Sequence, residues 1–265
     1  MLTILEFHNI SKHGIGWTNV HPRRFAEILD LILSRAEIIS PLGYGLPYLG
    51  EKTLGKPRVM LSFDDGYEEI YTRAYPLMKE RDVSGMVSIV AGYSGKTNLW
   101  DIGGGSLRHL YWNEISELLS AGWSVCSHSM THPDLRLCSD DRLVWELEES
   151  RSRLESRLKT AIPAIAYPFG RFNAKVILAT VRAGYSTGFT VGAEGMQVPR
   201  NSFTIRRVPV YQVDSDKLIL AKIGPDSLVK RLDAFKNRSF NKVSLITSFV
   251  HRNRYKGIPT EFLRD

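Results

Sequence analysis

The chain has 265 residues, of which 43% are hydrophobic and 24% are charged, and these proportions are typical of a soluble globular protein with a full hydrophobic core. It contains no apolar run near the ~20 residues that span a bilayer, and two cysteines, Cys126 and Cys138, are too few for a disulfide framework. Composition therefore excludes a transmembrane protein and a disulfide-rich secreted domain, and both thiols are expected to be buried or partly buried.

The net charge of +7 falls in the C-terminal part of the sequence. Residues 217–265 contain 11 Lys and Arg residues against 4 Asp and Glu residues, whereas residues 1–216 carry equal numbers of each sign. The sequence therefore predicts a main domain at 1–216 and a basic, partly helical extension at 217–265. Such an extension is either a solvated tail or a surface for an anionic partner. Its apolar segments, Leu218–Ile223 and Leu245–Val250, favour peripheral contact with an anionic membrane.

The N-terminal sequence, MLTILEFHNISKHG, has no basic region followed by a long apolar stretch. This pattern predicts a cytoplasmic protein, or a chain whose leader has been removed, rather than a retained signal peptide. The sequence also lacks a recognised nucleic-acid module, so the basic extension is not expected to bind nucleic acid.

Strands and helices alternate along the main domain. A β-rich run at 59–63 leads into Asp64 and Asp65, and a helix is expected at 68–81 with a kink or a restart at Pro76. Further strands are expected at 85–90, 123–127, 164–167, 186–191 and 205–211, and further helices at 111–121, 139–158 and 174–183. This alternation predicts an α/β fold with parallel strands and helical crossovers. Functional residues of such folds gather at the carboxyl ends of the strands.

Acidic and histidine side chains follow two of the predicted strands. Asp64 and Asp65 come directly after one strand, and His128 and His132 follow another. Each pair alone has a structural alternative, because HxxxH arises by chance and adjacent aspartates also occur in solvated turns and helix caps. Together they are more specific, since two imidazoles and a carboxylate with an open position form a catalytic donor set for zinc and related ions. The sequence therefore predicts a metal centre.

Three segments, LSFDDGY, SHSMTHP and AYPFG, resemble in this order the first three motifs of the polysaccharide deacetylase (NodB homology) family, carbohydrate esterase family 4. FHNI near the start and RRVPVY resemble elements of the branch that has an N-terminal YHxI-type element. The resemblance covers residues 4–213. It implies an α/β fold, a deformed (β/α) barrel of about seven β/α units in a single domain, with a deacetylase-like catalytic domain at 1–216.

The resemblance assigns a role to each motif residue. Asp64 matches the catalytic base, while Asp65, His128 and His132 match the ligands of a divalent metal. Zn²⁺ is the expected ion, and Co²⁺, Ni²⁺ or Mn²⁺ could occupy the same ligands. The metal would polarise an acetyl carbonyl and lower the pKa of a water molecule, whose proton Asp64 could take. A backbone N–H after Asp65 is expected to stabilise the oxyanion.

The acid that protonates the departing amine has two candidates. Many family members use a late histidine, to which His251 is a loose match, but the branch with the N-terminal element supplies its acid from that element, which favours His8. A structural hydrogen bond at a strand end is the other interpretation of His8. The remaining histidines outside the motifs are expected at the surface: His13, His21 and His109.

The third motif departs from the family pattern at Ala166, where members commonly have an arginine that pairs with the base. Arg207 or Arg171 could supply this positive charge. Without such a partner, the pKa of Asp64 would rise and the base would be less available at low pH.

These residues predict a metal-dependent hydrolase that removes N-acetyl groups from N-acetylhexosamine units of an oligo- or polysaccharide, with a cytoplasmic or lipid-linked glycan as the substrate. Aromatic side chains next to the motifs are expected to bind the glycan: Tyr67, Tyr167 and Phe169. Two alternatives stay open, namely a hydrolase of another amide or of a cyclic imide or ureide, and a catalytically silent carbohydrate-binding protein. The presence of the base and of all three ligands disfavours the silent protein.

Overall fold

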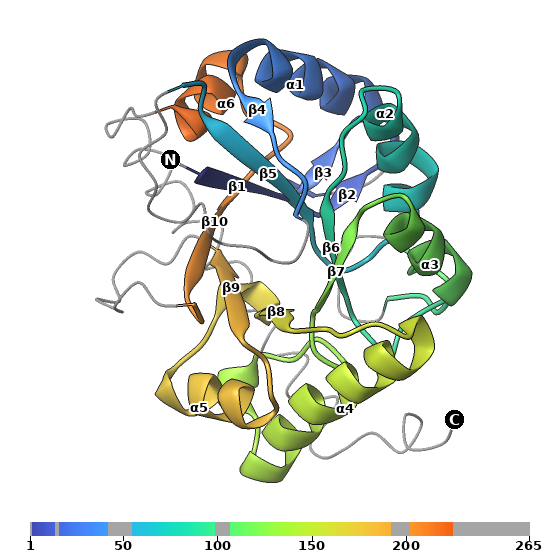
Figure 1. Cartoon of the computed structure of the whole chain (residues 1–265), viewed down its shortest axis with the longest axis vertical. Helices are drawn as coiled ribbons and strands as arrows, with labels where there is room; N and C mark the ends of the chain where they lie inside the picture. Colours follow the sequence, from blue (N-terminus) through green and yellow to red (C-terminus); the bar gives the residue numbers. More distant parts are fainter. Residues whose placement is uncertain (1, 14–15, 42–54, 99–106, 192–201, 225–265) are drawn as a thin grey trace.

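The computed structural model of the chain describes residues 2–13, 16–41, 55–98, 107–191 and 202–224 (Figure 1). Seven parallel strands close into a barrel in the order β1, β10, β9, β8, β7, β6, β5, and β5 pairs back onto β1. A further short strand, β4 (Glu37–Ile38), pairs with the first residues of β5. The predicted (β/α) barrel of seven units in a single domain is confirmed.

The strands of the barrel follow the chain from end to end. They are β1 (Leu2–Phe7), β5 (Arg58–Phe63), β6 (Met86–Ile89), β7 (Ser124–Ser127), β8 (Ala164–Ala166), β9 (Thr187–Val191) and β10 (Ile205–Pro209). The predicted strands agree with β5 to β10 to within two residues at each end. By contrast, β1 and the small parallel pair β2 (Asn9–Ile10) and β3 (Asn19–Val20) lie outside the predicted elements.

Helices surround the barrel (Figure 1): α1 (Pro22–Arg35), α2 (Tyr75–Lys79), α3 (Trp112–Ser120), α4 (Asp140–Leu158), α5 (Ala174–Arg182) and α6 (Asp216–Ile223). Two 3₁₀ turns cover Leu135–Leu137 and Pro168–Gly170. The predicted break at Pro76 is confirmed, because a π-helical segment at Ile70–Ala74 gives way to α2 there. Pro76 has no N–H to donate, and the change from π-helical to α-helical hydrogen bonding next to it accommodates the missing donor.

Alternate side chains of the barrel strands point outward to the helices and inward to the barrel interior. On one face, Leu5, Phe7, Leu61, Phe63, Val87 and Ile165 belong to the main hydrophobic core, which includes the buried faces of the helices. On the other face, every barrel strand contributes to a separate apolar cluster: Ile4, Met60, Met86, Cys126, Ala164, Ala166, Phe189 and Ile205. Because residues two apart on a strand share a face, this cluster fills the barrel interior. The next inward residues toward the carboxyl ends are buried and polar: Glu6, Ser62, Asp64, Ser88 and Arg207.

The beginning of the basic extension lies against the barrel. Helix α6 packs beside α1 and buries Ile219, Lys222 and Ile223 (Figure 1). The Lys222 ammonium donates to the Asp214 carboxylate and to the Pro209 carbonyl, each at 2.5 Å, so its buried charge is paired.

Residues 225–265 lie outside the described residues, and they include Leu245–Val250 and His251. The division of the chain at residue 216 and the membrane contact of Leu245–Val250 therefore stay predictions. For Leu218–Ile223 the predicted membrane contact is corrected, because α6 buries Ile219 and Ile223 within the fold. In the part of the chain that the structure describes, no helix is long and apolar enough to cross a membrane. Both thiols match expectation, since Cys126 is buried and Cys138 is partly buried.

Replacement of Phe189 tests the assignment of the barrel interior. Phe189→Ala is expected to lower the free energy of unfolding by ~3–5 kcal/mol, because the emptied space is enclosed by seven strands and cannot collapse. Leu178→Ala is the control, since Leu178 is 51% exposed on α5, and it should change the free energy by less than ~0.5 kcal/mol. Urea denaturation followed by circular dichroism measures both variants. Equal losses would contradict a packed interior around Phe189.

Candidate active site

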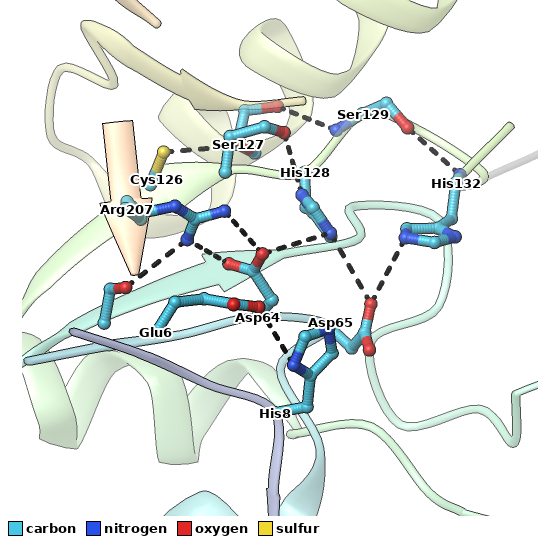
Figure 2. Close-up of polar contacts among 12 residues, drawn as sticks. Glu6, His8, Asp64, Asp65, Cys126, Ser127, His128, Ser129, His132 and Arg207 are labelled. Carbon is cyan, nitrogen blue, oxygen red and sulfur yellow. Dashed lines mark hydrogen bonds and ion pairs between the residues drawn. The ribbon is translucent and has the colours of Figure 1, made fainter. Parts of the chain in front are cut away.

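The motif residues meet at the carboxyl ends of three strands (Figure 2). Asp64 and Asp65 directly follow β5, His128 directly follows β7, and His8 directly follows β1. His132 lies in the loop between β7 and the first 3₁₀ turn, and its ring faces Asp65 in Figure 2. The fold therefore brings together residues that the sequence places in three separate motifs.

Asp65, His128 and His132 bring three metal-ligating atoms together. Oδ1 of Asp65 lies 3.5 Å from Nε2 of His128 and 3.3 Å from Nε2 of His132. Two ligand atoms that are each about 2.0–2.1 Å from a tetrahedral zinc ion lie about 3.4 Å apart, so both separations suit one shared ion. All three side chains are buried. Their number, chemistry and spacing fit a divalent metal with a coordination position left open.

The backbone of β8 orients His128. Nδ1 of His128 lies 2.8 Å from the Ala166 carbonyl oxygen, which can only accept, so Nδ1 carries the proton and Nε2 presents its lone pair. Burial lowers the pKa of His128, which favours the neutral form that a metal ligand requires. Ala166, where the family commonly has arginine, thus contributes its carbonyl to the site.

Strained backbone surrounds the site. Four non-glycine residues around it have positive φ: Asp65 (67°), Ser129 (65°), His132 (60°) and Phe169 (60°). This conformation costs an L-residue roughly 1–2 kcal/mol and persists only where neighbouring groups hold it. The loops are therefore fixed by contacts that the motifs themselves do not reveal.

One such contact comes from His109. Its Nδ1 donates to the carbonyl of Asp65 at 2.7 Å, and burial lowers the pKa of His109 to about 3, so the ring is neutral. The prediction that His109 is a surface residue is wrong, because the loop before α3 folds over the turn at Asp65 and buries the ring. His13 and His21 are exposed, as predicted.

A second contact comes from Glu146 on α4. Its carboxylate accepts from the backbone N–H groups of Met130 and Thr131, both at 2.8 Å, and from the Thr131 hydroxyl at 2.5 Å. Arg142 pairs with the same carboxylate at 2.7 Å and neutralises it. Glu146 thus holds the loop that carries both histidines. Sequence reasoning missed it, although a charged residue on the buried face of α4, next to Leu147, was an available signal.

Arg207 supplies the positive charge beside Asp64. Its Nη1 and Nη2 donate to Oδ1 and Oδ2 of Asp64 at 2.5 and 2.6 Å, and both side chains are buried. Arg171 instead pairs with Asp134 at 3.2 Å. Burial raises the pKa of Asp64, but the guanidinium outweighs this effect and holds the pKa well below its usual range. Of the two arginines that the sequence left open, the structure thus pairs Arg207 with Asp64.

His8 pairs with a second buried carboxylate. Its Nδ1 lies 2.9 Å from Oε1 of Glu6, whose side chain is fully buried, while the His8 side chain is 30% exposed. Burial lowers the pKa of His8, but Glu6, Asp65 and Asp64 together outweigh it and raise the pKa to about 10. His8 is therefore protonated at neutral pH, the state that a general acid needs. Sequence reasoning did not identify Glu6.

The aromatic residues differ from expectation. Tyr67 is 2% exposed and packs on His109, and Tyr167 is fully buried, so neither ring offers an open face to a sugar. The burial of both rings therefore gives no support to the predicted contact of these two tyrosines with the glycan, which stays a prediction. Phe169 is half-buried, with its ring centroid 4.7 Å from that of His132, and it stays a candidate for lining the site.

A closed parallel barrel with two histidines and two aspartates at the carboxyl ends of its strands defines the class, a (β/α)-barrel protein with a candidate metal-binding active site. The family model for polysaccharide deacetylase matches residues 51–188. The chain belongs to the polysaccharide deacetylase family, as its motifs indicate. This membership supports its assignment as a carbohydrate deacetylase.

Individual relatives agree with this assignment. The poly-beta-1,6-N-acetyl-D-glucosamine N-deacetylase of Staphylococcus aureus (strain MSSA476) is 26% identical over 235 residues, which are 84% of this chain and 70% of the relative. The structure of the Streptococcus pyogenes deacetylase PplD in complex with acetate has a TM-score of 0.71 at 24% identity and covers 84% of this chain and 98% of its own. IcaB from Ammonifex degensii has a TM-score of 0.65 at 20% identity, with coverages of 89% and 97%. The two structures share the fold of this chain.

Glu146→Gln tests how the histidine loop is held. The amide cannot accept from three donors and also neutralise Arg142, so the loop should loosen and the affinity for Zn²⁺ or Co²⁺ should fall by ~10–100-fold. Titration calorimetry measures the affinity. Glu148→Gln, at an exposed position on the same helix, is the control and should bind as the wild type does. Equal metal affinity in both variants would show that Glu146 does not support the loop.

Arg207→Met should change how stability depends on pH. In the wild type the pKa of Asp64 is depressed, so the stabilisation is complete above the usual pKa of aspartate and is lost as the pH falls. In the variant the buried carboxylate lacks its cation and its pKa is raised, so stability should fall as the pH rises, with a loss of ~3–5 kcal/mol at neutral pH. Urea denaturation at several pH values between about 4 and 8 measures the free energy of unfolding, because this range extends upward from the usual pKa of a carboxyl group. Arg206→Met, at an exposed position on the same strand, is the control, and its stability should depend on pH as that of the wild type does. A wild-type dependence on pH in Arg207→Met would refute the ion pair between Asp64 and Arg207.

Proposed function

We propose that the chain is a metal-dependent hydrolase that removes N-acetyl groups from N-acetylhexosamine units of an oligo- or polysaccharide. The observation that carries the proposal is the division between two adjacent aspartates. Asp65 faces the two histidines, whereas Asp64 is held by Arg207. One carboxylate is thus available as a ligand and the other as a base. The Staphylococcus aureus relative is a poly-beta-1,6-N-acetyl-D-glucosamine N-deacetylase, and this supports an N-acetylated glycan as the substrate class.

Asp65, His128 and His132 would hold the metal, with Zn²⁺ the expected ion and Co²⁺, Ni²⁺ or Mn²⁺ as alternatives for the same donors. When bound, a divalent cation polarises the acetyl carbonyl and makes the attacking water more acidic. The neutral state of His128 and the fixed direction of its Nε2 prepare this side chain for that task.

Asp64 would take the proton of the attacking water. Arg207 engages both oxygens of this carboxylate, yet each oxygen keeps a second lone pair, and Oδ2 lies 3.9 Å from Nε2 of His128 on the side of the metal ligands. Its depressed pKa keeps Asp64 ionised across the physiological range. The same depressed pKa makes Asp64 a weaker proton acceptor, so transfer of the proton to it would depend on a water molecule made more acidic by the metal.

His8 would deliver a proton to the departing nitrogen. An amine leaves poorly as an anion, so the C–N bond breaks only as the nitrogen gains a proton. The water oxygen forms a bond to the acetyl carbon, its proton passes to Asp64, and the His8 proton passes to the nitrogen. The products are acetate and a free amino sugar. A lipid-linked glycan, a cytoplasmic location and membrane contact of residues 225–265 belong to the proposal on sequence grounds alone.

Acetate release from oligomers of N-acetylglucosamine, in β-1,6 and β-1,4 linkage, tests the proposal. The wild type loaded with Zn²⁺ or Co²⁺ should release acetate. Asp64→Asn should reduce release by ~10²–10⁴-fold and keep its metal, because it loses only the base. Asp65→Asn should lose both the metal, measured by elemental analysis, and the activity. His13→Ala, at an exposed histidine, is the control.

Two results would contradict the assignment of roles: full activity in Asp64→Asn, or full metal content in Asp65→Asn. A wild type that holds metal but releases no acetate from any acetylated glycan would reject the substrate class.

A further inference from the structure

Glu6 is a buried carboxylate for which the reaction outlined above has no step. It lies on the inner face of β1, two residues before His8, and its side chain is fully buried. Removing a carboxylate from water costs several kcal/mol unless a cation compensates for it. Glu6 is one of the buried polar residues that point into the barrel, so nearby cations must compensate for its charge.

Two cations adjoin Glu6. Arg207 is one, because the charge of Glu6 helps to raise the pKa of its guanidinium, while both of its Nη atoms donate to Asp64. His8 is the other, with Nδ1 at 2.9 Å from Oε1 of Glu6. Polar atoms of Glu6, His8 and Asp64 lie within 4.8 Å of one another, and Figure 2 shows the Glu6 carboxylate beside Asp64 with its contact to His8. Two carboxylates and one guanidinium leave one negative charge, and a protonated His8 balances it.

We propose that Glu6 is a positioning residue for His8 in the deacetylation reaction. The ion pair occupies Nδ1, so Nε2 is the one ring nitrogen left to meet the departing amine. The charge of Glu6 compensates for the positive charge that His8 carries until it gives up its proton. The inference rests on the proposed function, because it assigns Glu6 to the acid half of the same reaction.

The same three side chains could be considered as a second cation site. The ion pair of Asp64 argues against this, since Arg207 donates to both of its oxygens and places a positive charge where the cation would lie. Glu6 therefore acts through His8.

The proposal distinguishes amide substrates from activated esters. An amide needs a proton on its leaving nitrogen, whereas an aryl acetate such as 4-nitrophenyl acetate expels a stable phenolate without one. Glu6→Gln should therefore lower kcat for an N-acetylglucosamine oligomer by ~10²-fold, with little change in KM. Its rate with 4-nitrophenyl acetate should fall by no more than ~3-fold. Glu37→Gln, at an exposed position on β4, is the matched control and should leave both rates unchanged.

A double substitution tests whether Glu6 acts through His8. Residues that work as a unit have non-additive effects, so Glu6→Gln should add less than ~3-fold to the loss already caused by His8→Gln. Glu6→Asp keeps the charge but draws it back by one methylene, and it should restore part of the amide activity that Glu6→Gln loses.

Equal losses on the amide and the ester would mean that Glu6 supports the barrel in general, and they would overturn the proposal. Additive effects of the two substitutions, or unchanged amide turnover in Glu6→Gln, would also overturn it. If Glu6→Gln does not fold, Glu6→Asp serves as the test, through the ratio of its rate on the amide to its rate on the ester. We expect this ratio to be lower than in the wild type. An unchanged ratio would contradict the role of Glu6. Failure of the wild type to release acetate would reject the proposed function itself, and this inference with it.

Discussion

The ion pair between Asp64 and Arg207 joins residues that are 143 positions apart in the sequence, and the arrangement of the site depends on it. In the barrel, β1 lies between β5, which ends directly before Asp64, and β10, which contains Arg207. The pair therefore spans the strand that bears Glu6 and His8. Because it rests on the apolar cluster of the barrel interior, its charges are poorly screened and each neighbouring charge must be matched. Two carboxylates, a guanidinium and an imidazolium together satisfy that condition.

Two successive residues, Asp64 and Asp65, acquire different properties from this environment. Asp64 continues the inward face of β5 and meets Arg207, which depresses its pKa. Asp65 enters the turn with positive φ, and this turns its side chain toward His128 and His132. Separate environments for neighbouring titratable groups are a general means of giving each its own chemical role. Here the separation is made by one left-handed residue at the end of a strand.

Local signals were enough to predict the middle of the barrel and the cluster of motif residues. Strands β5 to β10 have compact β-rich runs, and Asp64, Asp65, His128 and His132 stand at strand ends. The prediction omitted β1 and α1, although Pro22 and the apolar spacing of α1 were available as signals. Glu6, His109 and Glu146 could not be assigned from motifs, since their roles depend on which strands and loops the closed barrel brings together. The same holds for Tyr67 and Tyr167, whose burial is a property of packing.

Closure of the barrel by the first and last strands has a consequence for how the site is assembled. The three candidate ligands, Asp65, His128 and His132, come from a continuous central stretch of the chain. The groups that handle protons come from its ends as well, with His8 directly after β1 and Arg207 on β10. During synthesis, a chain that has reached only β9 already contains every ligand, but its base has no partner. All three candidate ligands are thus synthesised before Arg207, the residue that pairs with the base, and the barrel can close only after β10 has been made.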